Sequence, residues 1–180
     1  MSSHASAVPR QAPEASVPCA APVADLAAAA QAINDSPPLP AGHHPVLSRA
    51  WPLRDAIELG PVPAAVRRAR QRSRQMLRDW GLSKLIADTE LLVSELTTNA
   101  IAAVQSTLLV RMWLLADAER VLVLVWDPSP LPPVLAHSGL DAESGRGLQI
   151  VEAVSQLWDW YWPRDVTGKI VWALAGPARS

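Results

Sequence analysis

The sequence has little cysteine, little excess charge and no long apolar stretch. Its single cysteine, Cys19, has no partner in the chain, which excludes an intrachain disulfide. The formal net charge of -1 gives no sign of a polyelectrolyte partner. The longest apolar runs, such as residues 121–126, have the length of a strand and are too short to cross a membrane. Residues 1–13 are small and polar and predict no secretory leader. We therefore expect a soluble cytoplasmic protein with no membrane contact.

The beginning of the chain differs in composition from the rest. Residues 1–44 are rich in Ala, Pro and Ser and contain none of the 8 tryptophans. Such a segment cannot bury enough apolar surface to order itself, so we predict a disordered tail. The remaining length suits one domain of ordinary size. We place this domain at residues 45–176 and a short C-terminal tail at residues 177–180.

Periodicity and turn residues predict eight elements in the domain. In chain order they are a strand (46–53), two helices (63–80 and 83–105), a hairpin (107–115 and 120–126), a helix (149–156) and two strands (157–163 and 169–175). Pro52 suggests that the first strand lies at a sheet edge, and Ser83 is a candidate cap for the second helix. The unbroken apolar run at 121–126 predicts a central strand covered on both sides. This order predicts an α/β fold, a two-layer sandwich with helices on one face of the sheet.

The first predicted helix carries six arginines, at positions 67, 68, 70, 72, 74 and 78. An arginine face of this kind can bind nucleic acid, but no aromatic residue is interleaved with it and the chain is not basic. A solvated face or an acidic protein partner fits better, so we expect no nucleic-acid partner.

Glu95 and Asn99 form the first candidate site. They stand four residues apart on the second predicted helix, each one position before an apolar residue of its buried stripe. A carboxylate buried without a partner is costly, so we expect Glu95 to line a wet cleft or meet a ligand there. A carboxylate beside an amide suits a metal ion and a proton transfer. The alternative is an ordinary amphipathic helix with two polar residues at its rim.

Two further polar signals lie at the ends of predicted elements. Asp127 directly follows the central strand, where a carboxylate can accept a hydrogen bond from an exocyclic amine. Gly145 and Gly147 precede the third predicted helix, whose N-terminus offers free N–H groups and a favourable dipole to an anion. Taken alone, Asp127-Pro128 could be a common turn, and the glycines could permit a tight start to the helix. The loop at residues 131–143 is long enough to be a lid.

Together and in this order, these segments resemble a known superfamily. Residues 45–176 look like the Bergerat-fold (GHKL) ATP-binding domain of gyrase, Hsp90, histidine kinases and MutL proteins, and most resemble the stand-alone anti-sigma-factor serine kinases of bacteria. The resemblance rests on four segments, at residues 93–100, 125–130, 143–148 and 168–173. It implies a mixed, mostly antiparallel sheet, with ATP and Mg²⁺ as cofactors.

The resemblance also implies roles for individual residues. Asn99 matches an asparagine that ligates Mg²⁺, Glu95 a glutamate that acts as general base, and Asp127 an aspartate that binds the adenine amino group. Such kinases phosphorylate a serine of an anti-anti-sigma protein and otherwise hold a sigma factor, so these are the expected partners. The oligomeric state stays open, a homodimer included.

The phosphate side of the site is implied in the same way. Gly145 and Gly147 match the glycines that let a lid close over the phosphates, while Arg146 between them either touches a phosphate or is solvated.

The chain departs from the family pattern at several positions. Ala103 stands where a histidine is usual, and Ile170 where a threonine usually helps to seat the adenine. Prolines rather than glycines follow Asp127. The metal ligand and the base are kept, so a serine kinase is the first hypothesis. A non-catalytic module that senses nucleotide, or that binds a transcription regulator without nucleotide, is the second.

Overall fold

The structure is a computed structural model that describes residue 37 and residues 44–104, 109–133, 146–164 and 166–177. Its elements, in chain order, are β1 (Leu53–Leu59), α2 (Pro63–Asp79), a 3₁₀ turn η1 (Ser83–Leu85), α3 (Ile86–Ala103), β2 (Val110–Ala116), β3 (Val121–Asp127), α4 (Arg146–Val154), β4 (Leu157–Tyr161) and β5 (Lys169–Ala175). The predicted order of strands and helices is confirmed. The predicted lid at residues 131–143 lies mostly outside the described residues, as do the tails apart from residues 37, 44 and 177.

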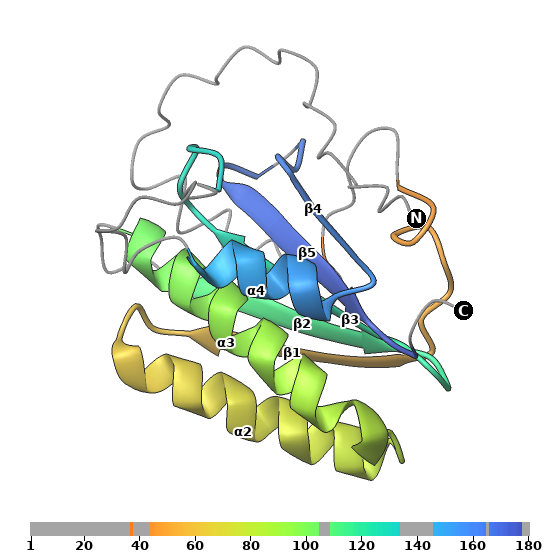
Figure 1. Cartoon of the computed structure of the whole chain (residues 1–180). Helices are drawn as coiled ribbons and strands as arrows, with labels where there is room; N and C mark the ends of the chain where they lie inside the picture. The colour runs from red at the N-terminus through yellow and green to blue at the C-terminus, as the bar shows by residue number, and fades with distance from the viewer. Residues whose placement is uncertain (1–36, 38–43, 105–108, 134–145, 165, 178–180) are drawn as a thin grey trace, which may run out of the picture.

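The strands form one sheet in the order β1-β2-β3-β5-β4. Each neighbouring pair among them is antiparallel. Figure 1 shows α2, α3 and α4 together on one face of this sheet, with α3 between the other two. The two-layer α/β architecture predicted from the order of elements is therefore the observed one, and β3 occupies its centre.

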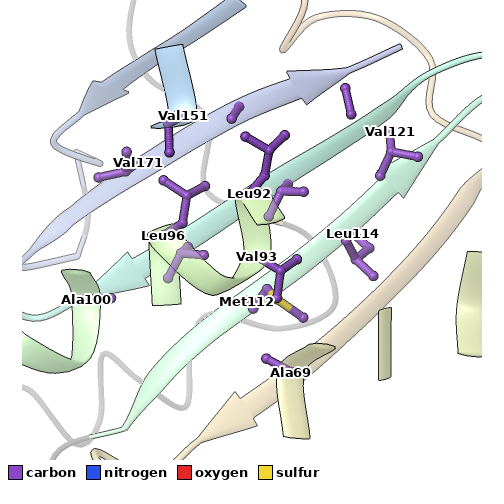
Figure 2. Packing of buried hydrophobic residues seen from close by; sticks show 14 of the residues in the cluster. Ala69, Leu92, Val93, Leu96, Ala100, Met112, Leu114, Val121, Val151 and Val171 are labelled. Atoms are coloured by element: carbon purple, nitrogen blue, oxygen red, sulfur yellow. The ribbon is translucent and has the colours of Figure 1, made fainter. Parts of the chain in front are cut away.

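The layer between helices and sheet is an aliphatic core. Leu92, Leu96 and Ala100 form the buried stripe of α3, as their spacing predicts, and each is at most 4% exposed. Figure 2 shows these residues beside side chains of the sheet such as Met112 and Val171. Burying a leucine stabilises a fold by roughly 1.5–3 kcal/mol, so this stripe fixes α3 firmly against the strands.

The opposite face of the sheet is rich in tryptophan. Trp113, Trp126 and Trp172 are at most 2% exposed and belong to a second cluster, which Leu47 and Trp51 from the segment before β1 also join. Every residue of β3 is buried because clusters lie on both of its faces. The prediction of a central strand covered on both sides is confirmed.

The first strand begins later than predicted. Residues 45–49 form turns instead, in which the Leu47 N–H donates to the His44 carbonyl oxygen at 2.8 Å. The Trp51 indole N–H reaches back to the Val46 carbonyl at 3.1 Å. The apolar residues Leu47 and Trp51, predicted to lie in a strand, instead pack on the tryptophan-rich face of the sheet. The strand that follows, β1, does lie at a sheet edge.

Helix α2 matches its prediction to within a residue, and its six arginines are exposed. Two of them form surface ion pairs, Arg72 with Asp55 and Arg74 with Glu90. The predicted cap at Ser83 is wrong. Ser83 opens η1, and the residue that precedes α3 is Leu85, which makes no side-chain capping hydrogen bond.

Helix α4 begins at Arg146, three residues earlier than predicted. Gly147 therefore lies in the first turn of the helix and not in a loop before it. Within the described parts of the chain, no helix combines the length and apolarity that crossing a membrane requires.

Candidate functional site

A cavity of about 370 Å³ lies beside the end of β3 and the start of β5, under the C-terminal half of α3. This volume is in the range of small-molecule sites, roughly 300–1,000 Å³. The wall is mostly apolar, with a few polar groups. The lining residues are Leu96, Asn99, Ala100, Ala102, Ala103, Val125, Asp127, Ser129, Leu131, Pro132, Pro133, Leu148, Lys169 and Val171.

Asp127 and Lys169 both line the cavity, and we call this pair the strand floor. The two residues face each other across β3 and β5 in the antiparallel register. Lys169 Nζ lies 2.8 Å from Asp127 Oδ1, and the backbone N–H of Ser129 donates to the same oxygen at 2.9 Å. Both side chains are buried, with 1% of Asp127 and 4% of Lys169 exposed. Burial raises the pKa of Asp127, and the ammonium group of Lys169 opposes that rise.

The turn before β5 holds this pair in place. Gly168 has φ of +109°, and a side chain there would collide with the carbonyl oxygen of Asp127. The Trp126 indole N–H donates to the Thr167 carbonyl at 3.2 Å. Only glycine permits so close an approach in this backbone conformation, so the turn fixes Lys169 opposite Asp127.

Glu95, Asn99 and Gly147 form a second group, which we call the helix rim, and Asn99 is its member that lines the cavity. Glu95 and Asn99 are one turn apart on α3 and partly exposed. A Cβ atom placed on Gly147 would lie 2.7 Å from Glu95 Oε2 and 3.2 Å from Asn99 Oδ1. The first turn of α4 thus rests on both side chains, and glycine leaves the room they occupy. Neither side chain hydrogen-bonds to another described residue.

The structure brings most of the predicted site residues together. Glu95, Asn99 and Gly147 meet at the rim, and Asp127 lines the same cavity as Asn99. Gly145 lies outside the described residues. Arg146 is the first residue of α4, and its side chain is not among the parts described.

Two positions at which the sequence departs from the resemblance, Ala103 and Ile170, lie on different faces of the sheet. Ala103 lines the cavity, so a methyl group forms that part of its wall. Ile170 is fully buried on the tryptophan-rich face, away from the cavity. Ile170 is therefore not part of this cavity's wall, and its place in an adenine seat stays a prediction. The side chains that β5 contributes to the cavity are Lys169 and Val171, because alternate residues of a strand point to opposite faces.

Sequence reasoning missed Lys169. It treated the lysine as the first residue of an apolar strand. A usable signal was present, since a lysine heading a strand that is buried throughout needs an opposite charge. Which carboxylate supplies that charge depends on the β3–β5 register.

Comparison with known families now adds to this geometry. Residues 61–174 match the histidine kinase-like ATPase domain family. The match covers well over half of the chain, and the chain belongs to that family. Comparison with curated proteins gives no match. The chain therefore contains an ATP-binding domain, and we ask whether the residues around the cavity fit a magnesium-bound nucleotide.

The residues present fit that ligand. Asn99 offers one neutral oxygen at the rim, and nowhere in the described ranges do three His, Cys, Asp or Glu side chains gather as a metal site. Mg²⁺ commonly takes only one or two protein oxygens and completes its shell with phosphates and water, so a single amide is compatible with it. The bare Cα of Gly147 leaves space beside Asn99 that any side chain would fill.

Proposed function

We propose that this protein is an ATP-dependent serine kinase of the anti-sigma-factor type, acting in the cytoplasm. It transfers the γ-phosphate of ATP to a serine of an anti-anti-sigma protein and otherwise holds a sigma factor. Membership of an ATP-binding family supports the nucleotide. The observation that carries the proposal is the meeting of Glu95 and Asn99 under Gly147 at the rim of the cavity.

Each polar residue then has a distinct task. The Asp127 carboxylate accepts a hydrogen bond from the amino group of the base, and the Asn99 amide oxygen ligates the metal. A bound magnesium nucleotide would supply the phosphoryl group, and its metal ion would neutralise the phosphate charge. The Glu95 carboxylate accepts the proton of the incoming serine hydroxyl. Its lack of a hydrogen-bond partner among the described residues leaves it able to do so.

A phosphate-transfer assay tests the proposal. The full-length protein is incubated with γ-labelled ATP, Mg²⁺ and serine-bearing regulators encoded nearby, and phosphoserine is measured on the regulators. We expect transfer that disappears with a metal chelator and falls about 100- to 10,000-fold in Glu95→Gln, the usual contribution of a general base.

The matched control is Glu152→Gln, which removes an exposed carboxylate from α4. It should transfer phosphate at the wild-type rate. If Glu95→Gln also keeps that rate, Glu95 is not the base.

A second candidate is a module that senses nucleotide without chemistry. It is favoured by Ala103, which puts a methyl group in the cavity wall where related kinases carry an imidazole. Trp126 directly precedes Asp127 and is one of the 8 tryptophans of the chain, so tryptophan fluorescence includes a signal from beside the floor. A fluorescence change on ATP addition without any phosphoserine would select this candidate, and the absence of both would leave a nucleotide-free binding module.

A further inference from the structure

We infer that Lys169 is a base-reading residue of the nucleotide site: its ammonium group donates a hydrogen bond to a ring nitrogen of the purine, next to the amino group accepted by Asp127. The inference rests on the proposed nucleotide site and extends it. It adds a hydrogen-bond donor to a floor for which the sequence predicts an acceptor alone.

The first observation is the unused hydrogen-bonding capacity of the floor. Asp127 Oδ1 already accepts from Lys169 and from the Ser129 N–H. No hydrogen bond with a described residue engages Oδ2, which remains available as an acceptor. An ammonium group has three donors, and Lys169 uses one of them within the described residues. Both side chains line the cavity.

The second observation is the poor solvation of the pair. Lys169 and Asp127 are almost entirely buried beside apolar wall residues such as Val125 and Leu148. This burial leaves little water to stabilise the two charges, which lie 2.8 Å apart, and it raises the pKa of Asp127. A buried ammonium with two unused donors gains from any acceptor that a ligand brings.

The third observation is the order in which the groups are presented. An acceptor from β3 and donors from β5 stand side by side in paired strands. In adenine, the amino group is a donor flanked by the acceptor nitrogens N1 and N7. The pair can therefore form two adjacent hydrogen bonds with one edge of the base. Because strand pairing and the Gly168 turn fix Lys169, it needs little rearrangement to do so.

The test uses nucleotides in which CH replaces one ring nitrogen, namely 1-deaza-ATP and 7-deaza-ATP. Their dissociation constants are measured by calorimetry with Mg²⁺ on the full-length wild-type protein and on Lys169→Met. On the wild type, one analogue should bind about tenfold to a hundredfold more weakly than ATP, the value of a hydrogen bond to a charged group. On Lys169→Met, that analogue and ATP should bind equally well.

Lys84→Met is the matched control, because Lys84 is exposed in η1 and is the other lysine of the chain. It should discriminate between ATP and the analogue as the wild type does. Thermal unfolding followed by circular dichroism shows whether Lys169→Met is folded. If it is not, Lys169→Met is combined with Asp127→Asn, which removes the unpaired buried carboxylate, and ATP and the analogue should again bind equally well.

Two results would overturn the inference. Either both analogues bind the wild type as tightly as ATP, or the loss for an analogue is the same in wild type and in Lys169→Met. A wild-type protein that binds no ATP at all is a different result, since the proposed function then fails and the inference fails with it.

Discussion

The strand floor and the helix rim both contribute to one cavity, the rim through Asn99, and they are built in opposite ways. At the floor, Asp127 and Lys169 are buried and bonded to each other, on strands whose register holds them. At the rim, Glu95 and Asn99 are partly exposed and hydrogen-bond to no other described residue. The floor is thus part of the fold as well as of the proposed base site, whereas the rim is left for a ligand. Changes at the floor should cost stability in addition to binding, and changes at the rim should cost binding and transfer alone.

The largest effect should come from Gly168→Ala, behind the floor. The substitution combines a φ of +109° with a collision against the Asp127 carbonyl, so we expect the free energy of unfolding to fall by about 3 kcal/mol or more. Urea denaturation followed by tryptophan fluorescence measures this loss.

Gly81→Ala separates the two causes. Gly81 also has positive φ, +74°, but a Cβ there meets nothing within 4 Å. Its replacement should cost only about 1–2 kcal/mol, the price of the conformation itself. Equal losses in the two variants would mean that the floor is not closely packed.

The second-largest effect should come from Asn99→Ala at the rim. Loss of an outer partner of a metal ligand already costs roughly 10- to 100-fold in affinity, so removing the ligand itself should weaken Mg²⁺-dependent ATP binding by at least about 100-fold. The free energy of unfolding should change by less than about 0.5 kcal/mol, because the site is a partly exposed helix position and alanine favours helix.

Calorimetry and urea denaturation of the same Asn99→Ala preparation provide both values. Thr98→Ala, one position earlier and exposed, is the control and should alter neither. A large loss of stability in Asn99→Ala would remove the contrast between rim and floor.

Gly147→Ala should separate binding from stability most cleanly. A methyl group there would press on Glu95 Oε2 at 2.7 Å and on the Asn99 amide at 3.2 Å, displacing both. We expect ATP affinity to fall about tenfold, as when a close contact in a binding site is lost. Stability should hold or rise by up to about 1 kcal/mol, because alanine replaces glycine within a helix.

Gly60→Ala is the control for this substitution, since nothing lies within 4 Å of a Cβ there. It should leave ATP affinity unchanged. Wild-type affinity in Gly147→Ala would place the ligand away from the first turn of α4.

The smallest effect concerns pH. Because the pKa of Asp127 is raised, the folded protein holds this proton more tightly than the unfolded chain does. The stability due to this group is therefore present at acid pH and is lost as the pH rises through its folded pKa. Binding has the opposite sign, since the protonated carboxyl is a poorer acceptor for the base. As the pH is lowered, adenosine affinity should fall about twofold by the pH that equals this pKa, where half of the carboxyls are protonated. This midpoint should lie above pH 3.8.

Adenosine is the ligand for this titration because it has no phosphate group to titrate. Asp127→Asn should show no such midpoint. A midpoint at or below 3.8 in the wild type would contradict the raised pKa.

Much of the fold was predictable because it rests on periodicity. The apolar stripe on α3 and the unbroken apolar run of β3 each indicate from local sequence which residues are buried. The first strand was misplaced because Leu47 and Trp51 carry the same apolar signal whether they extend a sheet or cover its face. Only tertiary packing distinguishes these outcomes, and here it places both residues on the tryptophan-rich face.

The site divides in the same way. Glu95 and Asn99 were found because their spacing on one helix is local information. Lys169 was missed because its partner, Asp127, is 42 positions away and is fixed by the register of β3 and β5. The sequence places Gly147 in a loop before the helix, whereas the structure requires glycine there because a side chain would collide with Glu95 and Asn99 of α3. No local pattern carries that information.

The most direct test of a single cavity spanning floor and rim is calorimetric titration of Asn99→Ala with adenosine and with magnesium-bound ATP. Adenosine reaches the floor alone, so its affinity should equal that of the wild type, while ATP affinity should be much weaker. If adenosine and ATP lose affinity together, or neither does, the floor does not bind the base while the rim binds the phosphates.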